Sequence, residues 1–129
     1  MPVRFDIDKE NRIITGSVSG DVSRDALASM LIQLKIITTN TTDCNLIFDL
    51  SDSQLTSSQM DMYRVISIVS SIVALREQIG EKIAHIVPDR RERIIHARDI
   101  GTVAALRGID YQVFTGLEKA YEWLKPLEP

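Results

Sequence analysis

Near the middle of the sequence stands a mostly apolar run, Cys44-Asn45-Leu46-Ile47-Phe48-Asp49, which is followed by the polar run Ser51-Asp52-Ser53-Gln54. A short apolar run that ends in turn-forming residues is typical of a buried strand. We therefore expect a strand over 44–49 and a loop directly after it.

Before this strand, the sequence predicts a hairpin and a helix. Residues 3–7 and 12–18 are both strand-like and flank a run of turn formers, which is the pattern of an antiparallel hairpin. Ser23 can cap a helix, because apolar residues recur with helical spacing from Leu27 to Leu34. We expect this helix to end near Ile37.

After residue 49, helical and strand-like segments alternate. Pro88 and Gly108 are natural end points for a strand and a helix, and Thr115-Gly116-Leu117-Glu118 has the spacing of a helix capping box. The predicted elements are a helix that begins near Ser57, a strand over 82–87, a helix over 90–107, a strand over 111–115 and a helix that ends at Lys125.

This order predicts one α/β domain over residues 1–129. Alternating strands and helices imply parallel pairing with right-handed crossovers. We expect a mixed, mainly parallel sheet of about five strands, with the antiparallel hairpin at its N-terminal edge and four helices largely on one face. Polar residues at alternate strand positions favour helices on one face, and they are Thr15, Asn45, His85 and Gln112.

Composition excludes several classes of function. The formal net charge of -3 lacks the positive field that most nucleic-acid binders use, so we expect no nucleic-acid partner. Cys44 is the only cysteine, which fits a reducing compartment. The longest uncharged run, 65–75, is shorter than the roughly 20 residues of a transmembrane helix. These features predict a cytoplasmic protein without a transmembrane segment.

The second predicted helix has an unusually wide apolar face. One stripe runs from Met62 to Val73, and another lies beside it at Val65, Ile68, Ile72 and Leu75. Because packing on a sheet covers a stripe of about 100°, part of this surface needs another partner. Three roles remain open, namely packing on a neighbouring helix, a subunit interface, and the wall of an apolar ligand site.

Three stretches of the chain resemble the SpoIIAA-like fold of the STAS regulatory domains and of a related group of small bacterial proteins. The resemblance implies a fold related to the CRAL-TRIO lipid-transfer domains. The stretches are Leu46-Ile47-Phe48-Asp49-Leu50-Ser51, Glu81-Lys82-Ile83-Ala84-His85-Ile86-Val87-Pro88, and Tyr111-Gln112-Val113-Phe114 with the helix Leu117-Glu118-Lys119-Ala120-Tyr121-Glu122-Trp123-Leu124.

In the anti-sigma-factor antagonists of this fold, the loop after the strand that corresponds to residues 44–49 ends in an Asp-Ser-Ser/Thr-Gly motif, whose first hydroxyl residue is a phosphorylation switch. Here the corresponding segment is Thr56-Ser57-Ser58-Gln59, in which Thr56 replaces the Asp and Gln59 replaces the Gly. The resemblance makes Ser57 a candidate switch, while its position at a helix start also fits an ordinary N-cap. We predict a phospho-switch or interaction loop at Asp49, Ser51, Ser57 and Ser58.

No motif in the sequence predicts catalysis. His85 and His96 have no partner at metal-ligand spacing, so we expect structural roles, with no metal and no cofactor. Acidic residues are interleaved among the arginines of the third helix, which is typical of a solvated helix face. These arginines are Arg90, Arg91, Arg93 and Arg98.

Two functional hypotheses follow. The first is a non-enzymatic regulatory or protein-interaction module of the STAS type, which binds a protein partner or forms a homodimer. The alternative is a carrier of a small apolar or lipid-like ligand, held between the second and third helices.

Overall fold

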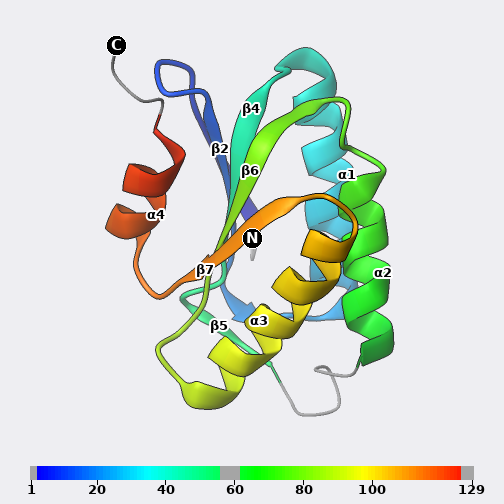
Figure 1. The fold of residues 1–129 in the computed structure, drawn as a ribbon, viewed down its shortest axis with the longest axis vertical. Helices are drawn as coiled ribbons and strands as arrows, with labels where there is room; N and C mark the ends of the chain where they lie inside the picture. The colour runs from blue at the N-terminus through cyan, green and yellow to red at the C-terminus, as the bar shows by residue number, and fades with distance from the viewer. Residues whose placement is uncertain (1–2, 56–61, 126–129) are drawn as a thin grey trace.

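The computed structural model describes residues 3–55 and 62–125, with the backbone alone for 62–64. Its main sheet has five strands in the order β1-β2-β4-β6-β7 (Figure 1). β1 is antiparallel to β2 and the other neighbours are parallel, which confirms the predicted mixed sheet with its N-terminal hairpin. The strands are β1 (Val3–Asp8), β2 (Ile13–Val18), β4 (Cys44–Asp49), β6 (Ile79–Ile86) and β7 (Asp110–Phe114).

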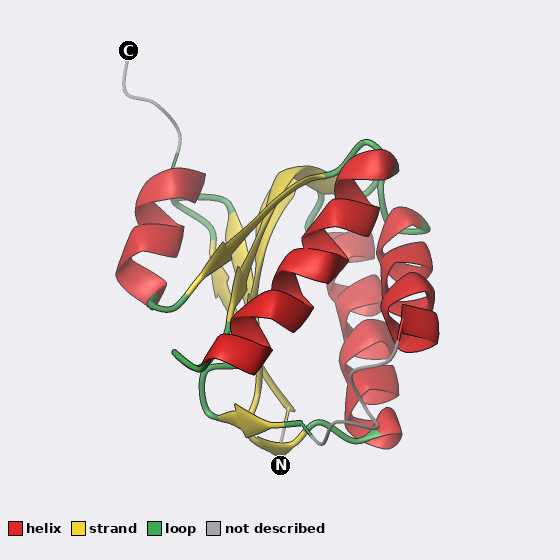
Figure 2. Cartoon of the chain, turned by 60° about the horizontal axis from the view of Figure 1, so that its bottom comes forward, coloured by secondary structure: helices red, strands yellow, loops and turns green. Residues whose placement is uncertain are grey.

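In the described part of the chain, four helices pack on this sheet, three of them on one face and one on the other (Figure 2). Each crossover from β2 to β7 steps in the same direction along the sheet, so right-handed connections place all the crossover helices on the same face. The last helix follows the final strand and is free to cover the opposite face. The helices are α1 (Arg24–Asn40), α2 (Met62–Val73), α3 (Arg91–Leu106) and α4 (Leu117–Leu124).

The sequence predicted the first residues of α1 and α4, and the structure confirms the prediction for α1 alone. Ser23 caps α1 as predicted, because its hydroxyl accepts a hydrogen bond of 3.0 Å from the backbone N–H of Ala26. The predicted capping box at Thr115 is wrong, since the N-cap of α4 is Gly116 and no side chain caps it.

A small second sheet was not predicted. It pairs β3 (Gly20–Asp21) in parallel with β5 (Ser53–Gln54), which lies in the expected loop after β4. Strands of two residues are too short to show alternation in a sequence. This pair fixes the loop after β4 to the segment that leads into α1.

Each face of the main sheet has its own hydrophobic core. The larger core lies under α1, α2 and α3 and includes Leu34, Leu46, Val69 and Ile83. The smaller one lies under α4 and joins Ile13, Ile47, Ala84 and Ile86 to Ala120 and Leu124.

The polar strand residues do not share one face. Asn45 lies on the α4 face, where its amide donates to the carbonyl of Leu124 at 3.4 Å. His85 lies on the opposite face, since its neighbours Ala84 and Ile86 both belong to the core under α4. This histidine is thus a buried polar group under the three-helix layer.

Candidate functional site

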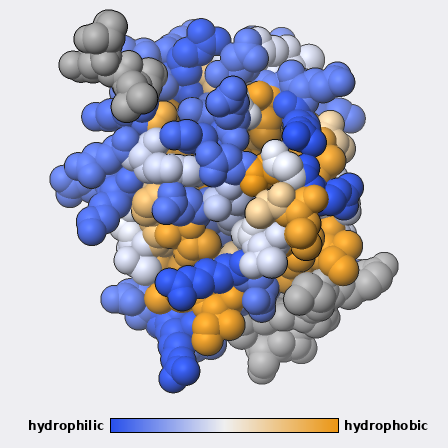
Figure 3. Space-filling model, in the orientation of Figure 1, coloured by the Kyte–Doolittle hydropathy of each residue, from blue (hydrophilic) through white to orange (hydrophobic). Residues whose placement is uncertain are grey.

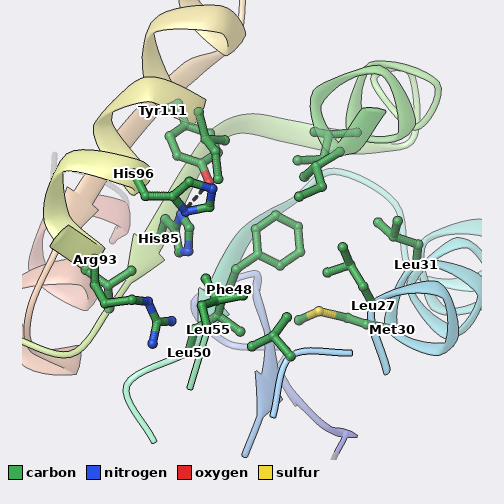
Figure 4. A pocket seen from close by; sticks show the side chains of 15 residues that line it. Leu27, Met30, Leu31, Phe48, Leu50, Leu55, His85, Arg93, His96 and Tyr111 are labelled. Atoms are coloured by element: carbon green, nitrogen blue, oxygen red, sulfur yellow. Dashed lines mark hydrogen bonds between the residues drawn. The ribbon is translucent and has the colours of Figure 1, made fainter. Parts of the chain in front are cut away.

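A cavity of about 50 Å³ lies between the sheet and helices α1, α2 and α3. Its two ends differ in chemistry (Figure 4). Arg93, His85, His96 and Tyr111 gather at one end, from α3, β6 and β7. The other end is apolar, with Leu27, Met30 and Leu31 of α1 opposite Ile68 and Ile72 of α2. Phe48, Leu50 and Leu55 lie between the two ends.

Arg93 is the charged group of the polar end. Arg93 is only 3% exposed. Its guanidinium donates to the carbonyl and the hydroxyl of Ser53, at 2.9 and 2.8 Å. Nε of Arg93 has no hydrogen-bond partner among the residues that the structure describes. Burial lowers the pKa of the guanidinium below its usual value.

The sequence prediction for Arg93 was therefore wrong. Arg90, Arg91 and Arg98 are exposed as expected, and Arg90 pairs with Glu92 at 3.1 Å. Arg93 instead belongs to the buried face of α3. A signal was available, because Arg93 is followed at helical spacing by small and apolar residues that are all buried, namely Ala97, Ile100 and Ala104.

His85 and Tyr111 form the second polar pair. The Tyr111 hydroxyl lies 2.6 Å from Nδ1 of His85, and the two rings meet edge to face. Burial, together with the nearby His96 and Arg93, lowers the pKa of His85 to about 3. Burial also raises the pKa of Tyr111. Both side chains are therefore neutral at pH 7.

The protonation states assign the hydrogens of this pair. Nδ1 of His85 is the hydrogen-bond partner that the structure gives the Tyr111 hydroxyl, so we assign the hydroxyl as donor and Nδ1 as acceptor. A neutral imidazole then carries its hydrogen on Nε2, and this atom is buried without a hydrogen-bond partner among the described residues. The polar end therefore holds a second unused donor.

Local sequence explains how these side chains come together. β7 pairs in parallel with β6, with Tyr111 opposite Ile83 and Val113 opposite His85. A Cβ at Gly101 would lie only 3.3 Å from the Tyr111 ring, so the glycine allows α3 to pack closely over this tyrosine. The small residue at this point of α3 thus helps to position the site.

The arrangement offers hydrogen-bond donors beside apolar surface, which are the properties of a binding site. His85 is neutral and Tyr111 is protonated, and none of the described residues that line the cavity is a carboxylate. Over residues 3–55 and 62–125, no cluster of three or more His, Cys, Asp or Glu side chains could hold a metal ion.

Of the predicted interaction loop, the structure describes Asp49 and Ser51, and neither lines this cavity. Asp49 accepts hydrogen bonds from the backbone N–H and the hydroxyl of Ser51, at 3.0 and 2.6 Å, so its carboxylate stabilises the turn after β4. Ser57 and Ser58 lie outside the residues that the structure describes.

The predicted stripe on α2 faces inward. Val65, Ile72 and Leu75 are buried in the larger core, and Ile68 is partly buried against it. Ile68 and Ile72 line the cavity, whereas Val65 and Leu75 do not. Ile68 and Ile72 therefore form part of the apolar wall of this cavity.

This architecture is the SpoIIAA-like fold. The chain is similar to a solved structure from Shewanella loihica, an uncharacterised protein of the DUF3478 family with a SpoIIAA-like fold. The match has a TM-score of 0.63 at 11% identity, and it covers 95% of this chain and 91% of that one. No protein-family model and no curated protein matches the sequence. In the described part of the chain, none of the helices has the length and hydrophobicity needed to cross a bilayer.

Proposed function

We propose that this protein is a non-enzymatic binding module that holds a small organic ligand in the cavity between the sheet and α1, α2 and α3. The observation that carries this proposal is the division of a mainly apolar cavity, whose few polar side chains, Arg93, His85, His96 and Tyr111, lie at one end. Such a division matches a ligand with a polar head and an apolar body. Of the two hypotheses from the sequence, the small-ligand carrier is the one that this geometry favours.

Size limits the ligand. A cavity of about 50 Å³ is well below the roughly 300–1,000 Å³ of sites for drug-sized molecules. The ligand is therefore small, or the helices separate to admit a longer apolar chain.

Native mass spectrometry of freshly purified protein tests this function. Leu27→Trp places a large side chain at the apolar end, and Ile36→Trp places the same side chain on the exposed surface of the same helix. We expect a bound small molecule on the wild type and on Ile36→Trp, but not on Leu27→Trp. A ligand-free wild type, or a ligand that persists in Leu27→Trp, would contradict the proposal.

A regulatory interaction surface is the second candidate. Ile32 and Ile36 of α1 are 62% and 59% exposed, and Ile66 of α2 is 49% exposed. Figure 3 shows hydrophobic residues gathered on the right-hand side of the molecule, where α2 lies. Exposed apolar patches of this kind are common at protein interfaces and favour a protein partner or a homodimer.

Sedimentation analysis separates the homodimer from a monomer. If the isoleucines form a subunit interface, the wild type sediments as a dimer and the Ile32→Lys/Ile36→Lys variant as a monomer. A monomeric wild type at high concentration excludes the homodimer.

A phosphomimetic variant tests the predicted switch in Thr56-Ser57-Ser58-Gln59. Loss of partner binding in Ser57→Asp, with Ser67→Asp as the control, would support this switch.

A further inference from the structure

We propose that the ligand of this cavity is a small monocarboxylate, whose carboxylate pairs with the buried guanidinium of Arg93 and whose apolar body lies against α1 and α2. This inference rests on the proposed function and names the chemical class of its ligand.

The first step is the charge of Arg93, which has no counter-ion in direct contact among the described residues. The ion pairs recorded over residues 3–55 and 62–125 join Arg12 to Asp43 and Arg90 to Glu92, and both lie at the surface. The groups that Arg93 contacts in Ser53 are a carbonyl and a hydroxyl, which are uncharged. Buried charges in proteins are normally paired. An anionic ligand would supply the missing partner.

The second step is the number of unused donors at this end. Nε–H of Arg93 and Nε2–H of His85 are both buried without a hydrogen-bond partner among the described residues. Both side chains line the same end of the cavity (Figure 4), and because the two donor atoms are themselves buried, a carboxylate reaches them when these side chains turn toward the ligand. A carboxylate presents two acceptor oxygens, and its geometry matches the planar donors of a guanidinium.

The third step is the rest of the lining. A phosphate or sulfate ion needs polar partners on all sides, but beyond the polar end the cavity wall is apolar and includes Leu27, Met30 and Ile68. A neutral alcohol would match this wall but would leave the charge of Arg93 unpaired. A carboxylate with a short apolar body satisfies both ends.

NMR titration of the 15N-labelled protein with four small probes tests the inference. The probes are butanoate, 1-butanol, butylammonium and inorganic phosphate. We expect butanoate to bind at least tenfold tighter than each of the others, with its largest shifts at cavity residues. We also expect the Nε–H signal of Arg93 to move downfield with butanoate alone, because that N–H gains a charged acceptor.

Matched variants test whether Arg93 provides the selectivity for butanoate over 1-butanol. Arg93→Met removes the buried charge, and Arg98→Met removes an exposed charge from the same helix. We expect Arg93→Met to bind butanoate no better than 1-butanol, and Arg98→Met to behave as the wild type. Arg93→Lys retains the charge without the Nε donor, so it provides a second comparison if Arg93→Met does not fold.

The outcomes separate this inference from the proposed function. Equal affinity for butanoate and 1-butanol at the cavity would overturn the carboxylate but leave the ligand site standing. Phosphate binding as tight as that of butanoate, or undiminished butanoate binding in Arg93→Met, would also overturn it. If none of the four probes shifts the cavity residues, the inference fails, whereas the proposed function is decided by the native mass spectrometry of the wild type and of Leu27→Trp.

Discussion

At the scale of single residues, the fold tolerates two polar groups that burial makes costly. Arg93 keeps its charge by donating to Ser53, whereas His85 avoids charge by remaining neutral. A buried charge that has only neutral partners costs free energy that a counter-ion would offset. The polar end of the cavity is therefore a place where a bound anion would raise the stability of the fold.

The low pKa of His85 predicts how stability changes with pH. Between about pH 3 and the unfolded value of 6.5, the unfolded chain binds a proton at His85 that the folded protein does not. Stability is thus fully present above pH 6.5 and falls as the pH drops through this range. We expect a loss of about 2 kcal/mol from this residue between pH 7 and pH 5, measured by urea unfolding.

A non-titrating variant isolates this effect. His85→Gln retains an acceptor for the Tyr111 hydroxyl, while His96 and Arg93 still face the site. We expect the difference between wild type and variant to shrink as the pH falls. If both proteins lose the same free energy between pH 7 and pH 5, His85 does not have the low pKa assigned to it.

At the scale of elements, Ser53 joins β5 to α3. Its hydroxyl donates to the carbonyl of Leu50 and accepts from Arg93, and the side chain is buried. We expect Ser53→Ala to lower the free energy of unfolding by about 1–3 kcal/mol, since a buried charged donor loses its partner. Chemical denaturation measures this loss, and the exposed Ser70→Ala is the control. Equal stability of the two variants would show that the link is unimportant.

The second core depends on α4. Leu124 is buried against the sheet, whereas Leu117 of the same helix is 46% exposed. We expect Leu124→Ala to cost about 2–5 kcal/mol of unfolding free energy, and Leu117→Ala much less. A Leu124→Ala variant as stable as Leu117→Ala would mean that α4 does not pack on this face.

The sequence predicted the elements better than it predicted the site. Helical periodicity and short apolar runs located the long helices and strands, because each of these helices buries one face and the central strands are buried on both. These patterns could not locate β3 and β5, which depend on contact between segments about 30 residues apart. Arg93 was placed on the surface because its neighbours are charged, although its helical spacing puts it inside. Charge composition describes a segment, but burial is decided residue by residue.

At the scale of the whole molecule, the two cores share one sheet, and we predict that residues 1–129 unfold as a single domain. Trp123, the only tryptophan, packs near Phe114 on the α4 side. Its fluorescence reports on the smaller core, whereas far-UV circular dichroism is dominated by α1, α2 and α3. We expect the two unfolding curves to coincide. Separate midpoints would show that α4 and its core unfold independently.

The polarised cavity is also a property of the whole molecule, because its polar end comes from α3, β6 and β7 and its apolar end from α1 and α2. No local motif could reveal it. The sequence did indicate that the apolar face of the second helix exceeds what a sheet can cover, and Ile68 and Ile72 show part of that excess at the cavity wall.

The most direct test of a ligand site in this cavity is the measurement of nuclear Overhauser effects between butanoate and a methyl-labelled protein. The account predicts contacts from the ligand methyl group to the interior methyl groups of Met30, Leu31 and Ile68. Contacts only to the exposed methyl groups of Ile32, Ile36 and Ile66, or none at all, would contradict it.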